Sequence, residues 1–213
     1  MTKSRSKSKK SLFKIFLEDE FLGCVPGILL LEQAIDVYDE SSELHFDSLT
    51  STQIESIVEW VTTSAKRKLV DYLAKMERSV FDCRAYLRRQ DVPSAIMDKV
   101  IAEAIKHKWL SDKRYAELYA EYALQNLMSP MDVRYKLIQK KIDKATIEKA
   151  INDVFSKDTV GDILDELIDK LLRRYADVNG RQKFDKIATA LYRKGFEYGE
   201  YESRLKEKIA NIE

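Results

Sequence analysis

The feature that most constrains the fold is a pattern of apolar residues that occurs three times. Leu87, Leu137 and Leu191 lie 50 and 54 residues apart, and each is followed by apolar residues at the same intervals of five, four and four. The three ladders are Val92, Met97, Ile101 and Ile105; Ile142, Ile147, Ile151 and Phe155; and Phe196, Tyr201, Leu205 and Ile209. These intervals predict a residue in a turn followed by one stripe of an α-helix.

A period of about 50 residues accommodates about three short helices. A unit of this kind cannot bury its own apolar stripe, so neighbouring units are expected to stack. We therefore predict a mainly α chain of three tandem three-helix repeats, the last one truncated, forming an elongated curved rod. A small α+β extension containing a β-hairpin precedes the repeats. Stacked repeats present concave surfaces, which favour binding over catalysis.

The predicted segments follow from these patterns. We expect a disordered basic tail (residues 1–10), an amino-terminal α+β extension (11–77), and helical repeats over 78–128, 129–180 and 181–213. Apart from Met1, the tail has no apolar side chain to bury, and we interpret it as a solubilising end rather than a nucleic-acid contact.

Within the extension, aromatic and β-branched residues from Ser11 to Val25 predict a β-hairpin that turns at Glu18, Asp19 and Glu20. A short helix from Gly27 to Tyr38 and a strand from Leu44 to Leu49 would complete a three-stranded antiparallel sheet. Thr50 and Gln53 have the spacing of a capping box that starts a covering helix.

Composition narrows the class of protein. Only 6 Gly and 3 Pro accompany 34% charged residues, which is typical of helices with solvated outer faces. No apolar run approaches the roughly twenty residues of a membrane span, and no secretory segment follows the amino terminus. Two cysteines, Cys24 and Cys83, suit reduced core thiols. These observations predict a cytoplasmic protein that does not enter a membrane.

The net charge of +1 hides a strong asymmetry along the chain. Residues 1–10 carry five bases and no acid, whereas residues 11–60 carry one base, Lys14, against eleven acids. A net charge of +6 is left for residues 61–213. The repeats are therefore expected to attract anionic partners such as phosphates or an acidic protein face.

Residue types with catalytic potential do not cluster. The two histidines, His45 and His107, lie far apart in the sequence, and the cysteines lack the paired spacing of a zinc site. We interpret the acids Asp162, Asp165 and Glu166 as a solvated helix face rather than a metal-dependent nuclease site. The sequence predicts no enzyme, no metal and no cofactor.

Three short motifs follow one another along the helical part of the chain. They are His107, Trp109, Leu110, Asp112, Arg114, Tyr115 and Ala116; then Pro130, Arg134, Leu137, Gln139, Lys140 and Ile142; then Leu191, Tyr192, Arg193, Lys194, Gly195 and Phe196. In this order and spacing they resemble the RecX family, from about residue 78 to residue 210. Lys108 and Lys141 stand where the family usually has glycine, and Leu127 and Ser129 where a glycine-rich link is common. Those turns must be built without a residue that easily adopts positive φ.

The resemblance implies a function. RecX proteins regulate the recombinase RecA: they lie in the helical groove of the RecA filament on single-stranded DNA, bridge its protomers, and suppress its ATPase, strand-exchange and coprotease activities. The resemblance therefore implies a modulator of homologous recombination and the SOS response. We also expect a monomer whose basic residues bind single- and double-stranded DNA weakly.

Basic residues are the candidates for contacts with RecA or DNA. Arg84 and Arg134 occupy equivalent repeat positions, as do Lys140 and Lys194, so stacking would align them on one surface. The candidates are Arg84, Arg88, Arg89, Arg134, Lys140, Lys141, Arg173, Arg174, Arg181, Lys183, Arg193 and Lys194. For any single one, plain solvation is an equally good interpretation.

Two alternatives from other functional classes remain open. One is an enzyme with an unrecognised site, which would bring several buried titratable residues together in one cleft. A helix-turn-helix-like DNA-binding regulator that does not target RecA would also present basic helices. Tyr115, Tyr119 and Tyr122 have the spacing of a base-stacking platform. Because Leu118 shares their helical stripe, we interpret all four as core residues.

Overall fold

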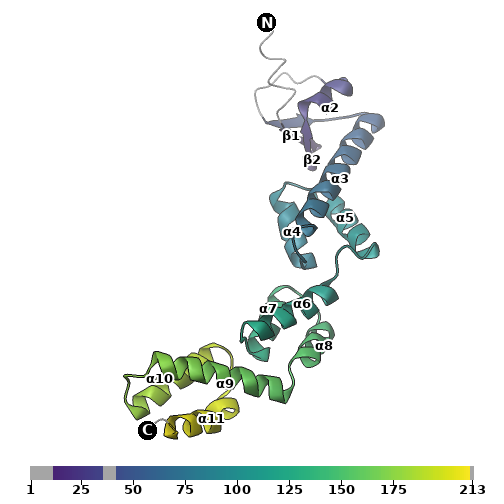
Figure 1. The fold of residues 1–213 in the computed structure, drawn as a ribbon. Coiled ribbons are helices and arrows are strands. Elements are labelled where there is room, and N and C mark those ends of the chain that lie inside the picture. The colour runs from purple at the N-terminus through teal and green to yellow at the C-terminus, as the bar shows by residue number, and fades with distance from the viewer. Residues whose placement is uncertain (1–11, 36–41, 212–213) are drawn as a thin grey trace. The chain divides into compact units, whose positions relative to one another are not determined.

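The structure is a computed structural model that describes residues 12–35 and 42–211 and divides the chain into two compact units, residues 1–111 and 112–213 (Figure 1). The predicted disordered tail and the end of the predicted helix from Gly27 to Tyr38 lie outside the described residues.

The first unit opens with the predicted hairpin. Strand β1 (Leu12–Leu17) pairs antiparallel with β2 (Glu20–Pro26), and Glu18 and Asp19 form the turn with φ of 46° and 65°. The hairpin prediction is therefore confirmed. The short helix α2 (Gly27–Glu32) follows, and β3 (Glu43–Phe46) adds the third strand in the order β2-β1-β3.

The antiparallel arrangement predicted for the third strand is wrong, because β3 pairs parallel with β1. Strand β2 ends opposite Leu12, at the end of the sheet where β1 begins. The connection that starts with α2 leads to the far edge of β1 at that same end, where Glu43 lies beside Lys14. A strand that starts there must run in the direction of β1.

Helix α3 (Ser51–Leu73) covers the sheet. Its first turn carries the predicted capping box, in which Thr50 Oγ1 accepts from the Gln53 N–H at 3.3 Å and Gln53 Oε1 accepts from the Thr50 N–H at 3.0 Å. Ile57 and Val61 are buried, and the helix packs against β2 and against the two helices that follow. These are α4 (Val80–Arg89) and α5 (Ser94–Lys106).

The second unit contains two further three-helix sets. Its helices are α6 (Asp112–Gln125), α7 (Pro130–Gln139), α8 (Lys144–Val154), α9 (Lys157–Arg174), α10 (Gly180–Arg193) and α11 (Tyr198–Ala210). The pairs α7–α8 and α10–α11 carry apolar ladders, and they pack against α6 and α9, the helices that precede them. In the first unit, α4–α5 packs in the same way against α3. The predicted mainly α repeat fold with a small α+β extension is thus confirmed.

The ladders form the cores of both units. All four residues of the second ladder are buried, and so are the first three residues of the other two. Ile105, in the last turn of α5, is 46% exposed, so its predicted core position is wrong. At the end of a helix the stripe no longer faces a neighbouring element.

The buried face of α6 differs from the prediction. Ala116, Ala120 and Ala123 are fully buried, whereas Leu118 and Tyr122 are 46% and 55% exposed. Tyr115 and Tyr119 are half-buried at the margin of the core. Alanines allow α6 to approach α7 and α8 closely, so larger side chains are displaced to the flanks. The predicted core positions of Leu118 and Tyr122 are therefore wrong.

The turns that end the helices keep one geometry without requiring glycine. Asp91, Lys108, Leu127 and Lys141 have φ between 52° and 60°, and Gly195 has φ of 82°. In the turn after α7, for example, the N–H of residue 141 donates to the Ile138 carbonyl and that of residue 142 to the Leu137 carbonyl. This is the Schellman pattern of a helix carboxyl end.

Side-chain caps begin three helices of the second unit, α7, α8 and α9. Asp143 caps α8, because its carboxylate accepts from the Thr146 N–H at 2.9 Å. Ser156 caps α9 and accepts from the Thr159 N–H at 3.1 Å.

Asp91→Gly tests the cost of these turns. Glycine relieves the positive φ at the end of α4 and removes an acid from a helix carboxyl end, so we expect the free energy of unfolding to rise by about 0.5–1 kcal/mol. Gln90→Gly is the matched control: Gln90 has φ of −95°, and glycine there should lower the same quantity by up to about 1 kcal/mol. Both tryptophans, Trp60 and Trp109, lie in the first unit, so their fluorescence during urea denaturation measures it. Equal losses in the two variants would contradict the turn assignment.

Candidate functional site

The structure divides the predicted basic residues between the two units. Arg84, Arg88 and Arg89 lie on α4 in the first unit. The others belong to the second unit, where they occupy α7 and its following turn (Arg134, Lys140, Lys141), the last turn of α9 (Arg173, Arg174), and α10 with its end (Arg181, Lys183, Arg193, Lys194).

Arg84 and Arg134 are bound to acids within their own repeats. Arg134 donates from Nε and Nη2 to the two carboxylate oxygens of Glu148, at 2.7 and 2.8 Å. Arg84 donates from Nη1 to Asp98 in the equivalent place. Each pair joins the two helices of a ladder, α4 to α5 and α7 to α8. These two arginines therefore connect helices within a repeat as well as contributing to the surface.

The Arg134–Glu148 pair should respond to acid. The hydrogen bond from Arg134 holds the pKa of the Glu148 carboxyl below its ordinary value. A depressed folded-state pKa means that the stabilisation is present above the unfolded pKa and lost as pH falls through the folded one. A double-mutant cycle with Arg134→Gln and Glu148→Gln is expected to give a coupling of about 0.5–1 kcal/mol at pH 7, since the pair is partly exposed. The coupling should vanish at a pH well below the ordinary glutamate pKa, and persistence there would contradict an ionic pair.

Helix α9 is polarised in charge. Residues 157–169 carry one base, Lys157, and the acids Asp158, Asp162, Asp165, Glu166 and Asp169, whereas residues 170–174 carry Lys170, Arg173 and Arg174. Charges of this order complement the helix dipole.

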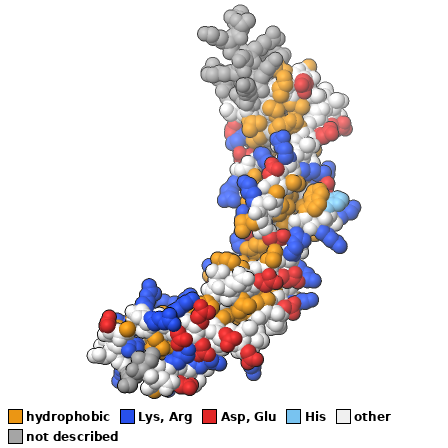
Figure 2. All heavy atoms as spheres, viewed as in Figure 1, with side chains coloured by type: hydrophobic (Ala, Val, Ile, Leu, Met, Phe, Trp, Pro, Cys, Tyr) orange, Lys and Arg blue, Asp and Glu red, His pale blue; other side chains and the backbone are white. Residues whose placement is uncertain are grey.

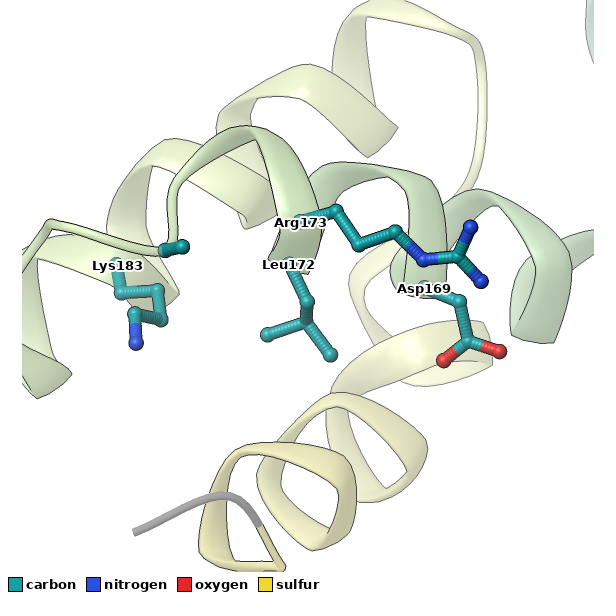
Figure 3. A pocket seen from close by; sticks show the side chains of 5 residues that line it. Asp169, Leu172, Arg173 and Lys183 are labelled. Carbon is teal, nitrogen blue, oxygen red and sulfur yellow. The ribbon is translucent and has the colours of Figure 1, made fainter.

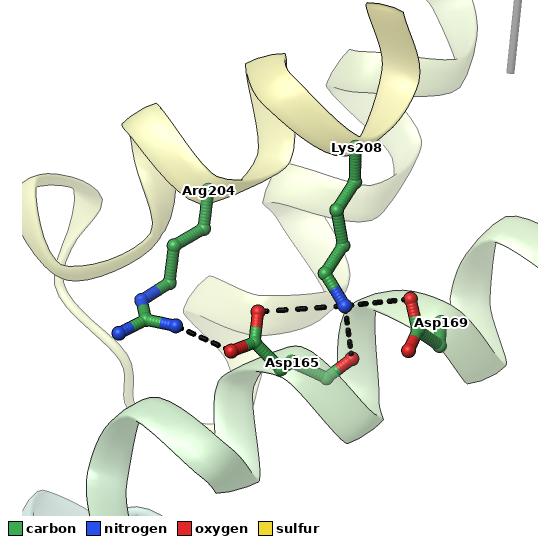
Figure 4. A network of polar contacts seen from close by, with 4 residues as sticks. All are labelled: Asp165, Asp169, Arg204 and Lys208. Atoms are coloured by element: carbon green, nitrogen blue, oxygen red, sulfur yellow. Dashed lines mark hydrogen bonds and ion pairs between the residues drawn. The ribbon is translucent and has the colours of Figure 1, made fainter. Parts of the chain in front are cut away.

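Helix α11 neutralises part of the acidic stretch of α9, residues 157–169 (Figure 4). Arg204 donates to Asp165, and Lys208 Nζ lies 2.7 Å from Asp169 Oδ1 and 3.4 Å from Asp165 Oδ1. Among the described residues there is no group of three or more His, Cys, Asp or Glu side chains placed to hold a metal ion.

The basic end of α9 borders two clefts. In the first, of about 350 Å³, Arg173 and Lys183 lie on either side of Leu172 (Figure 3). The second, of about 420 Å³, lies between the turn after α6, α9 and the end of α10, and its basic lining residues are Lys170, Arg174 and Lys194. Leu127, Leu167 and Leu171 form its apolar part, which we call the leucine floor. Figure 2 shows Lys and Arg side chains gathered over α9 and α10.

Known proteins resemble this chain in sequence. A family model described as the second three-helix domain of RecX matches residues 111–151, which contain α6, α7 and most of α8. A "Regulatory protein RecX" of Streptococcus uberis is 30% identical over 156 residues, covering 70% of this chain and 58% of the relative. One of Limosilactobacillus reuteri is 22% identical over 203 residues, covering 95% and 74%. The chain belongs to the RecX family. It spans 58% of the length of the Streptococcus relatives that it matches.

Solved RecX structures share the fold. A crystal structure of regulatory protein RecX superposes with a TM-score of 0.66 at 23% identity, covering 89% of this chain and 90% of that one. RecX from Lactobacillus salivarius gives 0.62 at 24% identity, covering 70% and 97%. Within the described residues of this RecX chain, no helix is long and apolar enough to cross a membrane.

Sequence reasoning found part of the second cleft of this RecX chain. It selected Arg174 and Lys194 but missed Lys170, which lies four residues before Arg174 and therefore on the same helix face. That spacing could have identified Lys170 from the sequence. The convergence of the turn after α6 with the end of α10 could not be identified in this way, because it depends on the packing of helices that lie far apart in the sequence.

Proposed function

We propose that this RecX-family protein binds the RecA recombinase filament and inhibits its ATPase, strand-exchange and coprotease activities. It thereby modulates homologous recombination and the SOS response. It acts in the cytoplasm as a monomer, by binding rather than by catalysis, and needs no cofactor. The observation that carries the proposal is the RecX match in sequence and fold, and the basic surface of α9 and α10 supports it.

Binding alone is sufficient for inhibition. A ligand that prefers one conformation of a filament shifts the population towards it by the difference between its two affinities. A preference of about 1.4 kcal/mol changes the ratio of the two states tenfold. No reaction on the inhibitor is needed.

The same basic surface is proposed to bind single- and double-stranded DNA weakly. Arg173, Arg174, Arg181, Lys183 and Lys194 can neutralise a few phosphates, and counterion release then makes the affinity fall with salt. The log–log salt slope is expected to be close to the number of phosphates neutralised, a few units at most for this surface.

The test is the steady-state ATPase rate of RecA on single-stranded DNA, titrated with this protein. We expect the rate to fall severalfold before the protein reaches one molecule per RecA protomer. A flat rate with folded protein that binds DNA would contradict the proposal and favour the helix-turn-helix-like DNA-binding regulator. Preference for one duplex sequence over another of equal length would then identify that alternative.

A further inference from the structure

We propose that the cleft between the turn after α6, α9 and the end of α10 binds an acidic segment of a partner protein that carries one large apolar side chain. The inference deepens the proposed function, on which it rests only for the identity of the partner. The apolar side chain lies on the leucine floor, and carboxylates on either side of it meet Lys170, Arg174 and Lys194.

The shape of the cleft suits one anchoring side chain. Its volume of about 420 Å³ holds an aromatic ring together with the neighbouring backbone. Leu167 and Leu171 are buried core residues of α9 whose edges reach the cleft, and Leu127 comes from the turn after α6. Protein interfaces concentrate their binding energy in apolar or aromatic anchors that fill such pockets.

The charge of the cleft has one sign. None of the described lining residues is acidic, whereas Lys170, Arg174 and Lys194 are basic. Glu166 pairs with Lys170 at 2.7 Å, but both side chains are more than half exposed, so this contact is weak. Helix dipoles explain why each cation stands near a helix end. They do not explain why three of them share one apolar cleft.

Leu127 is an independent observation at the same place. It has φ of 54°, a conformation that costs a side chain with a β-carbon about 1–2 kcal/mol. The corresponding turns after α4, α5, α7 and α10 hold Asp91, Lys108, Lys141 and Gly195, which are polar or glycine, and the turn after α2 holds Ala34, whose methyl group adds little apolar surface. A leucine kept in a strained conformation, where it both touches the core and lines the cleft, indicates that its apolar surface is used.

The floor favours a peptide over a nucleic acid. Single-stranded nucleic acid is bound by aromatic rings that stack on bases and by cations that follow the backbone. Here the floor is aliphatic, and Asn126, the one uncharged polar lining residue described, donates its side-chain N–H to the Tyr122 carbonyl. An aliphatic floor with basic walls matches an apolar side chain flanked by carboxylates.

The experiment measures binding of a short fluorescein-labelled peptide, glutamates around a central phenylalanine, to the full chain by fluorescence anisotropy. A second peptide has serine in place of the phenylalanine, and an oligothymidylate is the nucleic-acid probe. The cleft variant is Arg174→Glu with Lys194→Glu. Its control is Lys149→Glu with Lys157→Glu, which makes the same charge change on exposed residues of the second unit outside the cleft lining. Leu127→Asn removes the apolar side chain from the floor with a residue that tolerates positive φ.

We expect the serine peptide and the cleft variant each to weaken binding about tenfold or more, and the control variant to change it about twofold at most. Leu127→Asn should weaken the phenylalanine peptide and leave the serine peptide unchanged. Equal binding of the two peptides, or a loss confined to oligothymidylate, would overturn the inference. The two proposals fail separately: RecA inhibition without peptide binding rejects the cleft alone, and peptide binding with a flat RecA ATPase rejects RecA as target.

Discussion

Replacing Gly195 with alanine is expected to lower the free energy of unfolding of residues 112–213 by about 2–3 kcal/mol. Gly195 has φ of 82°, and a β-carbon there would lie 2.5 Å from Oγ of Ser129. Ser129 is buried and caps α7 by accepting from the Asp132 N–H at 3.0 Å. Alanine would therefore strain the turn after α10 and also displace the cap of α7.

Gly199→Ala is the matched control for this variant. Gly199 lies in α11, and a β-carbon there would meet nothing within 4 Å. Alanine should raise the stability by about 0.5–1 kcal/mol, because glycine loses more conformational freedom in a helix. Native-state hydrogen exchange of amides in α7 and α11 measures both effects. A Gly195→Ala protein as stable as the unaltered one would show that the turn does not support the α7 cap.

Replacing Asp165 with alanine is expected to give the second large decrease in the free energy of unfolding of residues 112–213. Asp165 forms ion pairs with both Arg204 and Lys208, so its removal leaves two cations of α11 without that partner. All three side chains are a quarter to two-fifths exposed, which limits each contact to at most about 1 kcal/mol. We expect a loss of about 1–2 kcal/mol, with the amides of α11 exchanging fastest. Glu166→Ala, which breaks only the exposed pair with Lys170 on the same helix, should cost less than about 0.5 kcal/mol. Equal losses would contradict the network.

The network also has a defined pH range. Burial of Lys208 acts to lower its pKa, but the hydrogen bond to Asp169 and the charges of Asp165 and Asp169 outweigh it and raise the pKa above the ordinary lysine value. A raised folded-state pKa means that the stabilisation is fully present below the unfolded pKa and lost as pH rises through the folded one. The contribution of Lys208 to the attachment of α11 to α9 should therefore be unchanged at neutral pH and be lost in strong alkali.

Much of the fold follows from local sequence patterns. The ladder intervals identify the helices because a helix and its apolar stripe share one period, and the hairpin and the Thr50 cap are set by neighbouring residues. The direction of β3 and the alanine face of α6 depend instead on which elements pack together. The helical spacing of Tyr115, Tyr119 and Tyr122 predicts core positions. Ala116, Ala120 and Ala123 instead allow α6 to pack more closely, and the tyrosines lie at the margin of the core or on the surface.

The candidate site shows the same division. Repeat equivalence indicated Arg84 and Arg134, yet their partners Asp98 and Glu148 lie on the next helix, fourteen residues later in both cases. That shared separation could have been read as an ion pair, since it joins the same positions in two repeats. The cleft beside α9 could not be foreseen, because Leu127, Lys170 and Lys194 come from three separate elements.

The most direct test of the central claim is binding of the labelled protein to preformed RecA filaments on single-stranded DNA, followed by fluorescence anisotropy. The matched measurement uses the same DNA without RecA at the same salt concentration. We predict saturable binding to the filament that is at least about tenfold tighter than to the bare DNA, because contacts with RecA add to the weak contacts with phosphate. Equal affinity for filament and bare DNA would contradict RecA as the partner.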